Sequence, residues 1–161
     1  RLAHNVSEHV QETLIETYAA HYLNPNNHNM TLFPEALSCL QRLQQQGYWL
    51  AIATGKGRSG LDKAIAQTDT QAFWLETACA SEYPSKPAPD MVLALCDRLG
   101  VEPKEAVVVG DTTHDLEMAA NAKIRAIAVA TGAHTAQQLS SMPHVAMLNS
   151  LANLPDVLET L

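Results

Sequence analysis

Apolar side chains recur every fourth position near the start of the chain, which predicts an amphipathic helix with one apolar stripe. The stripe consists of Val6, Val10, Leu14, Tyr18 and Tyr22. The run N-P-N-N-H-N at residues 24–29 follows, and its turn-forming residues predict a loop or linker. We therefore place a domain boundary there, with residues 1–30 on one side and residues 31–161 on the other.

Short apolar runs alternate with helical patterns beyond this boundary. Strands are predicted at residues 48–53, 73–80, 106–109, 124–130 and 145–148. Helices are predicted from Pro34 to Gly47, at 61–66, from Asp90 to Gly100, at 116–122, at 136–139 and at the C-terminus to Leu161. This alternation is typical of βαβ units, and it predicts an α/β fold with a mainly parallel sheet.

The run A-V-V-V-G-D-T-T-H-D from Ala106 to Asp115 is the most informative stretch. Its continuous apolar residues predict a strand buried on both faces, as in a parallel sheet between helix layers. Asp111 then lies just past the carboxyl end of that strand. Open α/β sheets bind their ligands at this edge.

Composition narrows the class of protein. The 161 residues suffice for one ordinary domain and a small addition, and 47% apolar with 17% charged residues indicates a globular chain. A net charge of −7 without a basic cluster argues against a nucleic-acid partner. The chain shows no membrane-length apolar run and no signal-peptide pattern, so we predict a soluble cytoplasmic protein without a membrane partner. Cys39, Cys79 and Cys96 are interpreted as reduced core thiols.

Polar residues of three kinds follow the predicted strands and loops. Thr54 with Gly55 offers a hydroxyl and backbone N–H groups, which suit an anion at a strand-to-helix turn. Lys86 offers a positive charge for a phosphate or a carboxylate. Each has a simpler interpretation as well: Thr54 is a common kind of turn residue, and an isolated lysine is most often a solvated surface charge.

Asp111 and Asp115 are spaced four apart and offer hard oxygen ligands. Mg²⁺ prefers one or two carboxylates together with waters and phosphate oxygens, so this pair is a candidate magnesium site. Asp115 equally fits an acidic residue in the first turn of a helix. His114 lies between the two carboxylates and is interpreted as an exposed bystander. A hydroxyl, a lysine and two carboxylates at one sheet edge favour phosphoryl chemistry.

Together these residues resemble the haloacid dehalogenase superfamily, most closely its phosphoglycolate phosphatase-like branch. The matching stretches are A-I-A-T-G-K with Thr54, S-K-P-A-P-D with Lys86, and V-V-V-G-D-T-T-H-D with Asp111 and Asp115. The flanking stretches F-P-E-A-L, G-R-S-G-L and A-A-N-A-K agree too. The order and spacing fit from about Phe33 to the C-terminus.

The resemblance implies a Rossmann-like three-layer core and a Mg²⁺-dependent phosphatase that works through an aspartyl-phosphate. Thr54 and the Gly55 N–H would bind the phosphoryl group, and Lys86 would neutralise it. Asp111 would hold Mg²⁺, with Asp115 supporting the metal directly or through water. Residues 1–30 would be the last part of a helical cap, and residues 31–161 the core.

One family motif is absent from the printed sequence. The family's D-x-D-G-T motif lies on its first strand and supplies the nucleophile, but this chain contains no D-x-D. That strand would lie between the strand ending at Thr54 and the strand ending before Asp111. Without it, the two edges would have to pair with each other or be filled by another chain. The resulting hypothesis is that this chain is an inactive fragment of a phosphatase.

Two classes of function follow for the whole protein. One is an enzyme that hydrolyses a small phosphorylated metabolite, with phosphoglycolate as the family's leading candidate and pyrophosphate or a sugar phosphate behind it. The other is a non-catalytic module that binds Mg²⁺ and phosphate or a protein partner. A dehalogenase is a weaker rival, because it would not need the paired aspartates. The oligomeric state cannot be predicted from these residues.

Overall fold

The computed structural model describes residues 7, 9–10, 12–14, 16–17 and 30–161. The chain divides into two compact units, Arg1–Thr31 and Leu32–Leu161. In the first unit, the described residues from 9 to 17 are helical, as the apolar stripe predicts. Val6, Tyr18, Tyr22 and the predicted loop at 24–29 lie outside the described residues.

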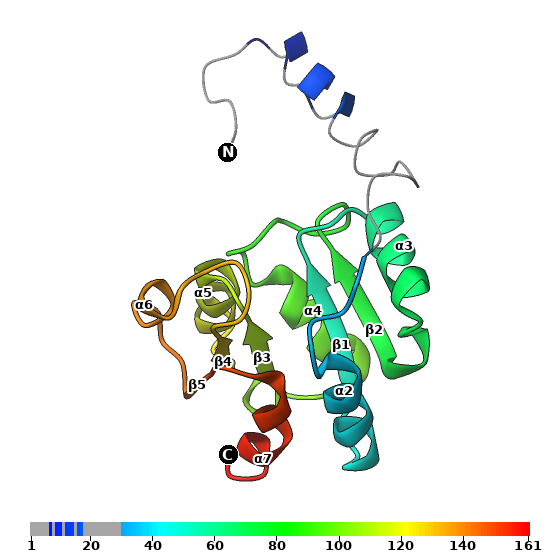
Figure 1. Cartoon of the computed structure of the whole chain (residues 1–161). Helices are drawn as coiled ribbons and strands as arrows, with labels where there is room; N and C mark the ends of the chain where they lie inside the picture. Colours follow the sequence, from blue (N-terminus) through cyan, green and yellow to red (C-terminus); the bar gives the residue numbers. More distant parts are fainter. Residues whose placement is uncertain (1–6, 8, 11, 15, 18–29) are drawn as a thin grey trace. The chain divides into compact units, whose positions relative to one another are not determined.

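The second unit alternates strands and helices in the predicted order (Figure 1). Its strands are β1 (Leu50–Thr54), β2 (Trp74–Cys79), β3 (Val107–Gly110), β4 (Arg125–Val129) and β5 (Ala146–Leu148). Its helices are α2 (Ala36–Gln45), α3 (Arg58–Thr68), α4 (Asp90–Leu99), α5 (Thr113–Asn121), α6 (Ala136–Leu139) and α7 (Leu154–Leu158). Short 3₁₀ turns lie at Gln71–Phe73, Pro103–Glu105 and Leu151–Asn153. The α/β fold class predicted from the sequence is confirmed.

The described strands form two parallel sheets. One contains β1 and β2, and the other has the order β3-β4-β5. The two strands that were expected to flank a further strand, β1 and β3, do not pair with each other in the described structure. The expected three-layer sandwich is therefore present with an opening inside its sheet.

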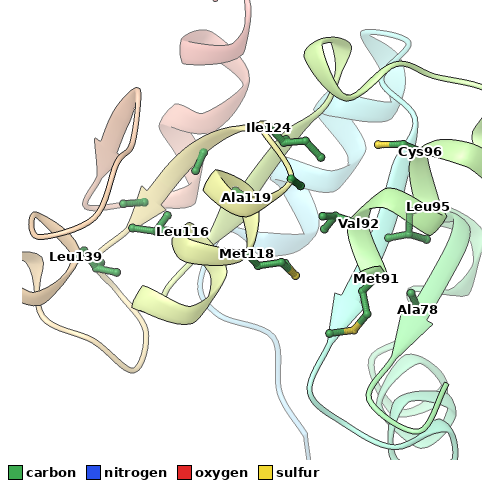
Figure 2. Close-up of a cluster of buried hydrophobic side chains, with 13 residues drawn as sticks. Ala78, Met91, Val92, Leu95, Cys96, Leu116, Met118, Ala119, Ile124 and Leu139 are labelled. Carbon is green, nitrogen blue, oxygen red and sulfur yellow. The ribbon is translucent and has the colours of Figure 1, made fainter. Parts of the chain in front are cut away.

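Two apolar clusters cover the two faces of the sheets. Along β4, Ala126 and Ala128 belong to the cluster formed with α4 and α5, which Figure 2 shows. Ile127 between them belongs to the cluster formed with α2 and α7. Because successive strand residues point to opposite faces, β4 is buried from both sides.

Both faces of β3 are covered as predicted, because Val108 packs against the cluster of α4 and α5 and Val107 against that of α2 and α7, but the strand is less buried than predicted. Val107 and Val108 are only half-buried, and Val109 is 39% exposed, whereas Ala126–Val129 of β4 are buried. All five residues of β1 are half-buried as well. The reason is the position of these strands: among the described residues, β1 and β3 each have a neighbouring strand on one side only.

Several predicted boundaries also differ from the structure. Pro34 lies in a turn, and α2 begins at Ala36 after Glu35, which has a left-handed backbone conformation with a φ of 67°. The helix predicted at 116–122 begins three residues earlier, because Thr112 caps it. The C-terminal helix is short, and the last residues form a turn. In the part of the chain that the structure describes, no helix has the length and apolar character needed to cross a bilayer.

Candidate active site

An ion pair joins the loop after β2 to the helix after β3. Lys86 Nζ donates to Asp115 Oδ1 at 2.6 Å, and the two side chains are 18% and 9% exposed. Lys86 follows the carboxyl end of β2, and Asp115 follows the carboxyl end of β3. Because β1 runs parallel to β2, the contact places the carboxyl ends of the two sheets at the same edge. The sequence-based expectation that polar residues after different strands converge is met by this pair.

Asp115 uses both carboxylate oxygens within the protein. Oδ1 accepts from Lys86, while Oδ2 accepts from the Thr112 N–H at 3.0 Å and the Thr112 hydroxyl at 2.6 Å. Burial alone would raise the pKa of Asp115. The hydrogen bond and charge of Lys86, with the Thr112 hydrogen bonds, overcome this effect and hold the pKa below its ordinary value. Asp115 is therefore an ionised carboxylate that orients Lys86 and, as the third residue of α5, completes the capping box of that helix.

Asp111 is the first residue after β3, and the loop after β4 holds it. The Ala133 N–H donates to Asp111 Oδ2 at 2.7 Å, and the His134 N–H donates to the Asp111 carbonyl at 3.1 Å. A Cβ on Gly132 would lie 1.9 Å from Asp111 Oδ2, so only glycine fits there. Among the described residues, Oδ2 of Asp111 accepts a hydrogen bond from this loop, and Oδ1 has no hydrogen-bond partner.

Thr54 ends β1 and makes a local turn contact. Its hydroxyl oxygen accepts the Lys56 N–H at 3.2 Å, as expected for a turn residue. The hydroxyl hydrogen is therefore available to donate elsewhere. A Cβ on Gly55 would meet nothing within 4 Å, so the space beside the Gly55 backbone is open to a ligand.

The structure places the five predicted site residues as follows. It brings Lys86 and Asp115 into direct contact, and Asp111 lies at the same strand end as Asp115. Thr54 and Gly55 follow the neighbouring β1, and no recorded bond joins them to the other three. The roles of all five remain predictions.

Three contributing residues were missed at the sequence level. Thr112 has a recognisable signal, because T-T-H-D has the spacing of a capping box, in which the cap and the third helical residue bond reciprocally. Gly132 and His134 follow the next predicted strand, 21 and 23 residues after Asp111, and no sequence pattern links them to Asp111. The Thr113 N–H donates to His134 Nδ1 at 3.1 Å, and the rings of His134 and His114 lie 6.3 Å apart.

The donor set fits a cation that retains most of its water. No group of three metal-binding side chains occurs among the described residues. Mg²⁺ needs only one or two protein carboxylates beside waters and phosphate oxygens. Asp111 Oδ1 has no protein partner among the described residues, whereas both carboxylate oxygens of Asp115 already accept hydrogen bonds from Lys86 or Thr112.

Comparison with known sequences identifies the family. The haloacid dehalogenase-like hydrolase family matches residues 2–129, which include all five predicted site residues. The chain belongs to the haloacid dehalogenase-like hydrolases. The resemblance inferred from the three motifs is thus confirmed at the level of the family.

Three curated relatives are similar to part of this chain. "Probable phosphatase IndB" of Dickeya dadantii is 37% identical over 112 residues, 68% of this chain and 48% of that protein. "Pyrophosphatase PpaX" of Bacillus velezensis is 30% identical over 145 residues, 89% of this chain and 67% of that protein. "Phosphoglycolate phosphatase" of Pasteurella multocida is 30% identical over 97 residues, 59% of this chain and 43% of that protein. The chain spans about half to two thirds of the length of these relatives.

Solved structures support the fold. A haloacid dehalogenase-like family hydrolase from Streptococcus pneumoniae superposes with a TM-score of 0.85 at 19% identity, covering 97% of this chain and 73% of that one. At this identity the match establishes the shared fold only. The α/β architecture of the chain is therefore shared with that structure.

Proposed function

We propose that the whole protein is a Mg²⁺-dependent phosphatase of small phosphate monoesters that works through an aspartyl-phosphate. The observation that carries this proposal is the Lys86–Asp115 ion pair at the sheet edge beside Asp111. The ion pair holds the positively charged Lys86 side chain at the edge where the three motifs predict a bound phosphoryl group. The phosphatase names of the three curated relatives support the reaction class.

Each predicted site residue has a distinct task in this proposal. The Thr54 hydroxyl and the Gly55 N–H donate to the phosphoryl oxygens. Lys86 has three N–H donors, of which one is directed to Asp115, and the others neutralise the developing charge. In phosphoryl transfer the protein acts mainly by positioning groups and stabilising charge.

Asp111 would hold Mg²⁺ through its free carboxylate oxygen, and Asp115 would support the site by fixing Lys86. Bound there, the ion would neutralise phosphate oxygens that Lys86 does not reach. The Ala133 N–H fixes the carboxylate of Asp111 before any ligand arrives. The chain thus pre-arranges one metal ligand and one cation at the same edge.

The printed chain on its own is proposed to be inactive. It contains no D-x-D, so it lacks the pair of aspartates that the family uses as nucleophile and acid/base. In this proposal Thr54 and Lys86 bind the phosphate and Asp111 holds the metal, so none of the three serves as the nucleophile. The substrate class follows the relatives, with phosphoglycolate and pyrophosphate as the first two compounds to test.

A phosphatase assay with and without Mg²⁺ tests the proposal on the protein extended to the length of its relatives. Asp111→Asn and Lys86→Ala are expected to lower kcat/KM by at least about 100-fold, the scale of losing one charge-stabilising group. Asp156→Asn removes an exposed carboxylate of the C-terminal helix and is expected to leave activity unchanged. An extended protein that is inert with both compounds, or whose Asp111→Asn variant retains full activity, would favour the binding module instead.

A further inference from the structure

Two loops at the carboxyl ends of β1 and β2 carry the residues that are proposed to bind phosphate. The Thr54 loop (residues 54–57) leads from the last residue of β1 to α3, and the Lys86 loop (residues 80–89) leads from β2 to α4. In the proposed function, the Thr54 hydroxyl, the Gly55 N–H and the Lys86 ammonium group contact the same phosphoryl group. Their relative placement therefore depends on how the two loops are joined.

Arg58 joins the two loops through a bidentate ion pair with Glu82. Arg58 is the first residue of α3 and directly follows the Thr54 loop. Its Nε donates to Glu82 Oε1 and its Nη2 donates to Glu82 Oε2, both at 2.8 Å. Glu82 lies in the Lys86 loop. Two parallel N–H···O bonds fix the mutual orientation of the two planar groups as well as their distance.

Further hydrogen bonds of the same region hold the loops in register. The Arg58 N–H donates to the Ser81 hydroxyl at 3.1 Å, and the Ala80 N–H donates to the Lys56 carbonyl at 3.1 Å. The Arg58 Nη1 donates to the Thr77 hydroxyl of β2 at 2.9 Å. The guanidinium of Arg58 is thus anchored both to β2 and to the loop that follows it.

The Lys86 loop has other anchors, which attach it to other elements. Arg98 Nη2 of α4 donates to the Tyr83 hydroxyl at 2.5 Å, and Asn121 Nδ2 of α5 donates to the Pro87 carbonyl at 3.0 Å. These contacts hold the loop against α4 and α5. Arg58 holds it against the Thr54 loop, so the Arg58–Glu82 pair bears on the spacing between the two sets of phosphate donors.

The contacts of Arg58 suit positioning better than binding of a substrate. All three guanidinium nitrogens donate to side chains of the protein. The hydrogen bonds from Arg58 hold the pKa of Glu82 below its ordinary value, so the pair is ionised near neutral pH. The two side chains are 37% and 34% exposed, and solvent screening keeps the contribution of such a pair to stability small. The main effect of the pair is therefore on geometry.

We propose that Arg58 and Glu82 are positioning residues, which set the distance between the donors of Thr54 and Gly55 and the ammonium group of Lys86. This inference rests on the proposed phosphatase function and adds to its site two residues that do not touch the substrate. A misplacement of about 1 Å at a reacting centre can cost about 100-fold in rate. Loosening the joint between the loops is thus expected to slow phosphoryl transfer.

The joint between the loops can be measured on the printed chain without a substrate. Hydrogen exchange of the Ala80 amide reports on its bond to the Lys56 carbonyl, which crosses from one loop to the other. Arg58→Lys keeps the positive charge but cannot form the two-pronged contact with Glu82. We expect this variant to speed exchange of the Ala80 amide at least about tenfold, as in a local opening, and to leave the amides of β4 unchanged.

Arg42→Lys is the matched control for this experiment. Arg42 pairs with Asp156 between α2 and α7, and the two side chains are 46% and 64% exposed. The control makes the same chemical change in another exposed ion pair, away from both loops. Exchange of the Ala80 amide is expected to be the same in Arg42→Lys as in the unchanged chain.

Kinetics of the extended protein measure the consequence for the reaction. Arg58→Lys and Arg58→Gln are both expected to lower kcat about tenfold and to change KM less than about twofold, because the orientation of the pair matters and not its charge alone. Arg42→Lys should retain full kcat. A long-range effect of the positive charge would instead leave Arg58→Lys as active as the unchanged protein.

A double-mutant cycle with Lys86 separates positioning from a general loss of structure. Lys86→Ala removes the group whose placement is at issue, so Arg58→Gln should lower kcat less than about twofold further in that background. Arg58→Gln, Glu82→Gln and the double variant should all lose the same factor, because each removes the same contact.

Three results would overturn the proposal. The first is an unchanged exchange rate of the Ala80 amide in Arg58→Lys. The second is full kcat of Arg58→Lys in an active extended protein. The third is the same loss from Arg58→Gln with and without Lys86. An inert extended protein would contradict the proposed function instead, and exchange of the Ala80 amide in the printed chain would then decide by itself whether Arg58 joins the two loops.

Discussion

The carboxylate of Asp115 caps helix α5 and pairs with Lys86 at the sheet edge. Asp115 is the third residue of α5, where an acidic side chain also interacts favourably with the helix N-terminus. Gly110 leaves room for it, because a Cβ there would lie 2.2 Å from the Asp115 Cβ. The two sequence-level interpretations of Asp115, a first-turn acid and a site residue, are therefore compatible: the first is observed, and the second remains a prediction.

Asp115→Asn is expected to destabilise the chain by about 3 kcal/mol at pH 7, because it leaves the part-buried Lys86 without its counter-charge. The pKa of Asp115 is lowered in the folded state. Its stabilising contribution is therefore complete above the unfolded pKa of about 4 and is lost as the pH falls through the folded pKa. Urea unfolding of both proteins from pH 3 to pH 7 measures the difference.

The difference between Asp115→Asn and the unchanged chain should thus shrink below pH 4. Asp156→Asn serves as the control, since Asp156 and its partner Arg42 are 64% and 46% exposed and the pair is screened by solvent. A constant difference across the whole pH range would contradict the assigned origin of the stabilisation.

Gly132→Ala is expected to displace Asp111, because the new Cβ would lie 1.9 Å from Oδ2 and 2.4 Å from Cγ. In the extended protein, this change should raise the Mg²⁺ concentration needed for half-maximal activity at least tenfold. Gly57→Ala is the matched control, since a Cβ at Gly57 meets nothing within 4 Å. Identical Mg²⁺ dependence in the two variants would argue against a positioning role for the loop.

At the residue scale, the predictable part of the site is the part that is local in sequence. Asp111 and Asp115 follow an apolar run, and Lys86 lies in a distinctive proline-containing stretch. The Lys86–Asp115 distance and the support of Asp111 by Ala133 depend on strand order, which no local pattern encodes. The sequence could therefore nominate the residues but not their partners.

Helix α5 begins where the capping box places it. The Thr112 hydroxyl oxygen accepts the Asp115 N–H at 3.3 Å, and Asp115 accepts the Thr112 N–H in return. Helix α6 has the same arrangement between Thr135 and Gln138. The two helices thus provide the same cap in different surroundings, since α5 carries four buried residues and α6 only one.

Thr112→Ala is expected to lower the free energy of unfolding by about 1 kcal/mol, the usual contribution of an N-cap side chain. The loss of the hydrogen bond from the Thr112 hydroxyl to Asp115 Oδ2 adds to this. Thr135→Ala should cost less, because only one of the four residues of α6, Leu139, is buried. Denaturant unfolding monitored by circular dichroism measures both. Equal losses, or a larger loss for Thr135→Ala, would contradict this ranking.

At the element scale, the apolar pattern located every strand to within a few residues but overestimated the burial of β3. Three consecutive valines indicate that both faces of a strand are suited to burial. They do not indicate whether a neighbouring strand is present on each side. The apolar pattern indicates whether the faces of a strand are suited to burial, whereas the exposure of its residues also depends on whether its edges are paired. The residues of β1 are half-buried for the same reason.

At the scale of the whole molecule, the described part of the chain connects the two sheets through packed helices and the Lys86–Asp115 ion pair, without backbone pairing between the sheets. Native-state hydrogen exchange should therefore rank the strands. The amides of β4, which has partners on both sides, are expected to exchange only on global unfolding. Alternate amides of β1 and β3, which face the side without a strand partner, should exchange at least 100-fold faster; uniform protection across all three strands would contradict this.

The Lys86–Asp115 pair joins the two sheets at the edge where phosphate is proposed to bind. An anion that draws Lys86 away from Asp115 must weaken this joint. By reciprocity, whatever separates the sheets frees Lys86 and raises its affinity for the anion by the same factor. The affinity for phosphate is therefore thermodynamically linked to the distance between the β1-β2 sheet and the β3-β4-β5 sheet, so that a change in this distance is accompanied by a change in the affinity for the anion.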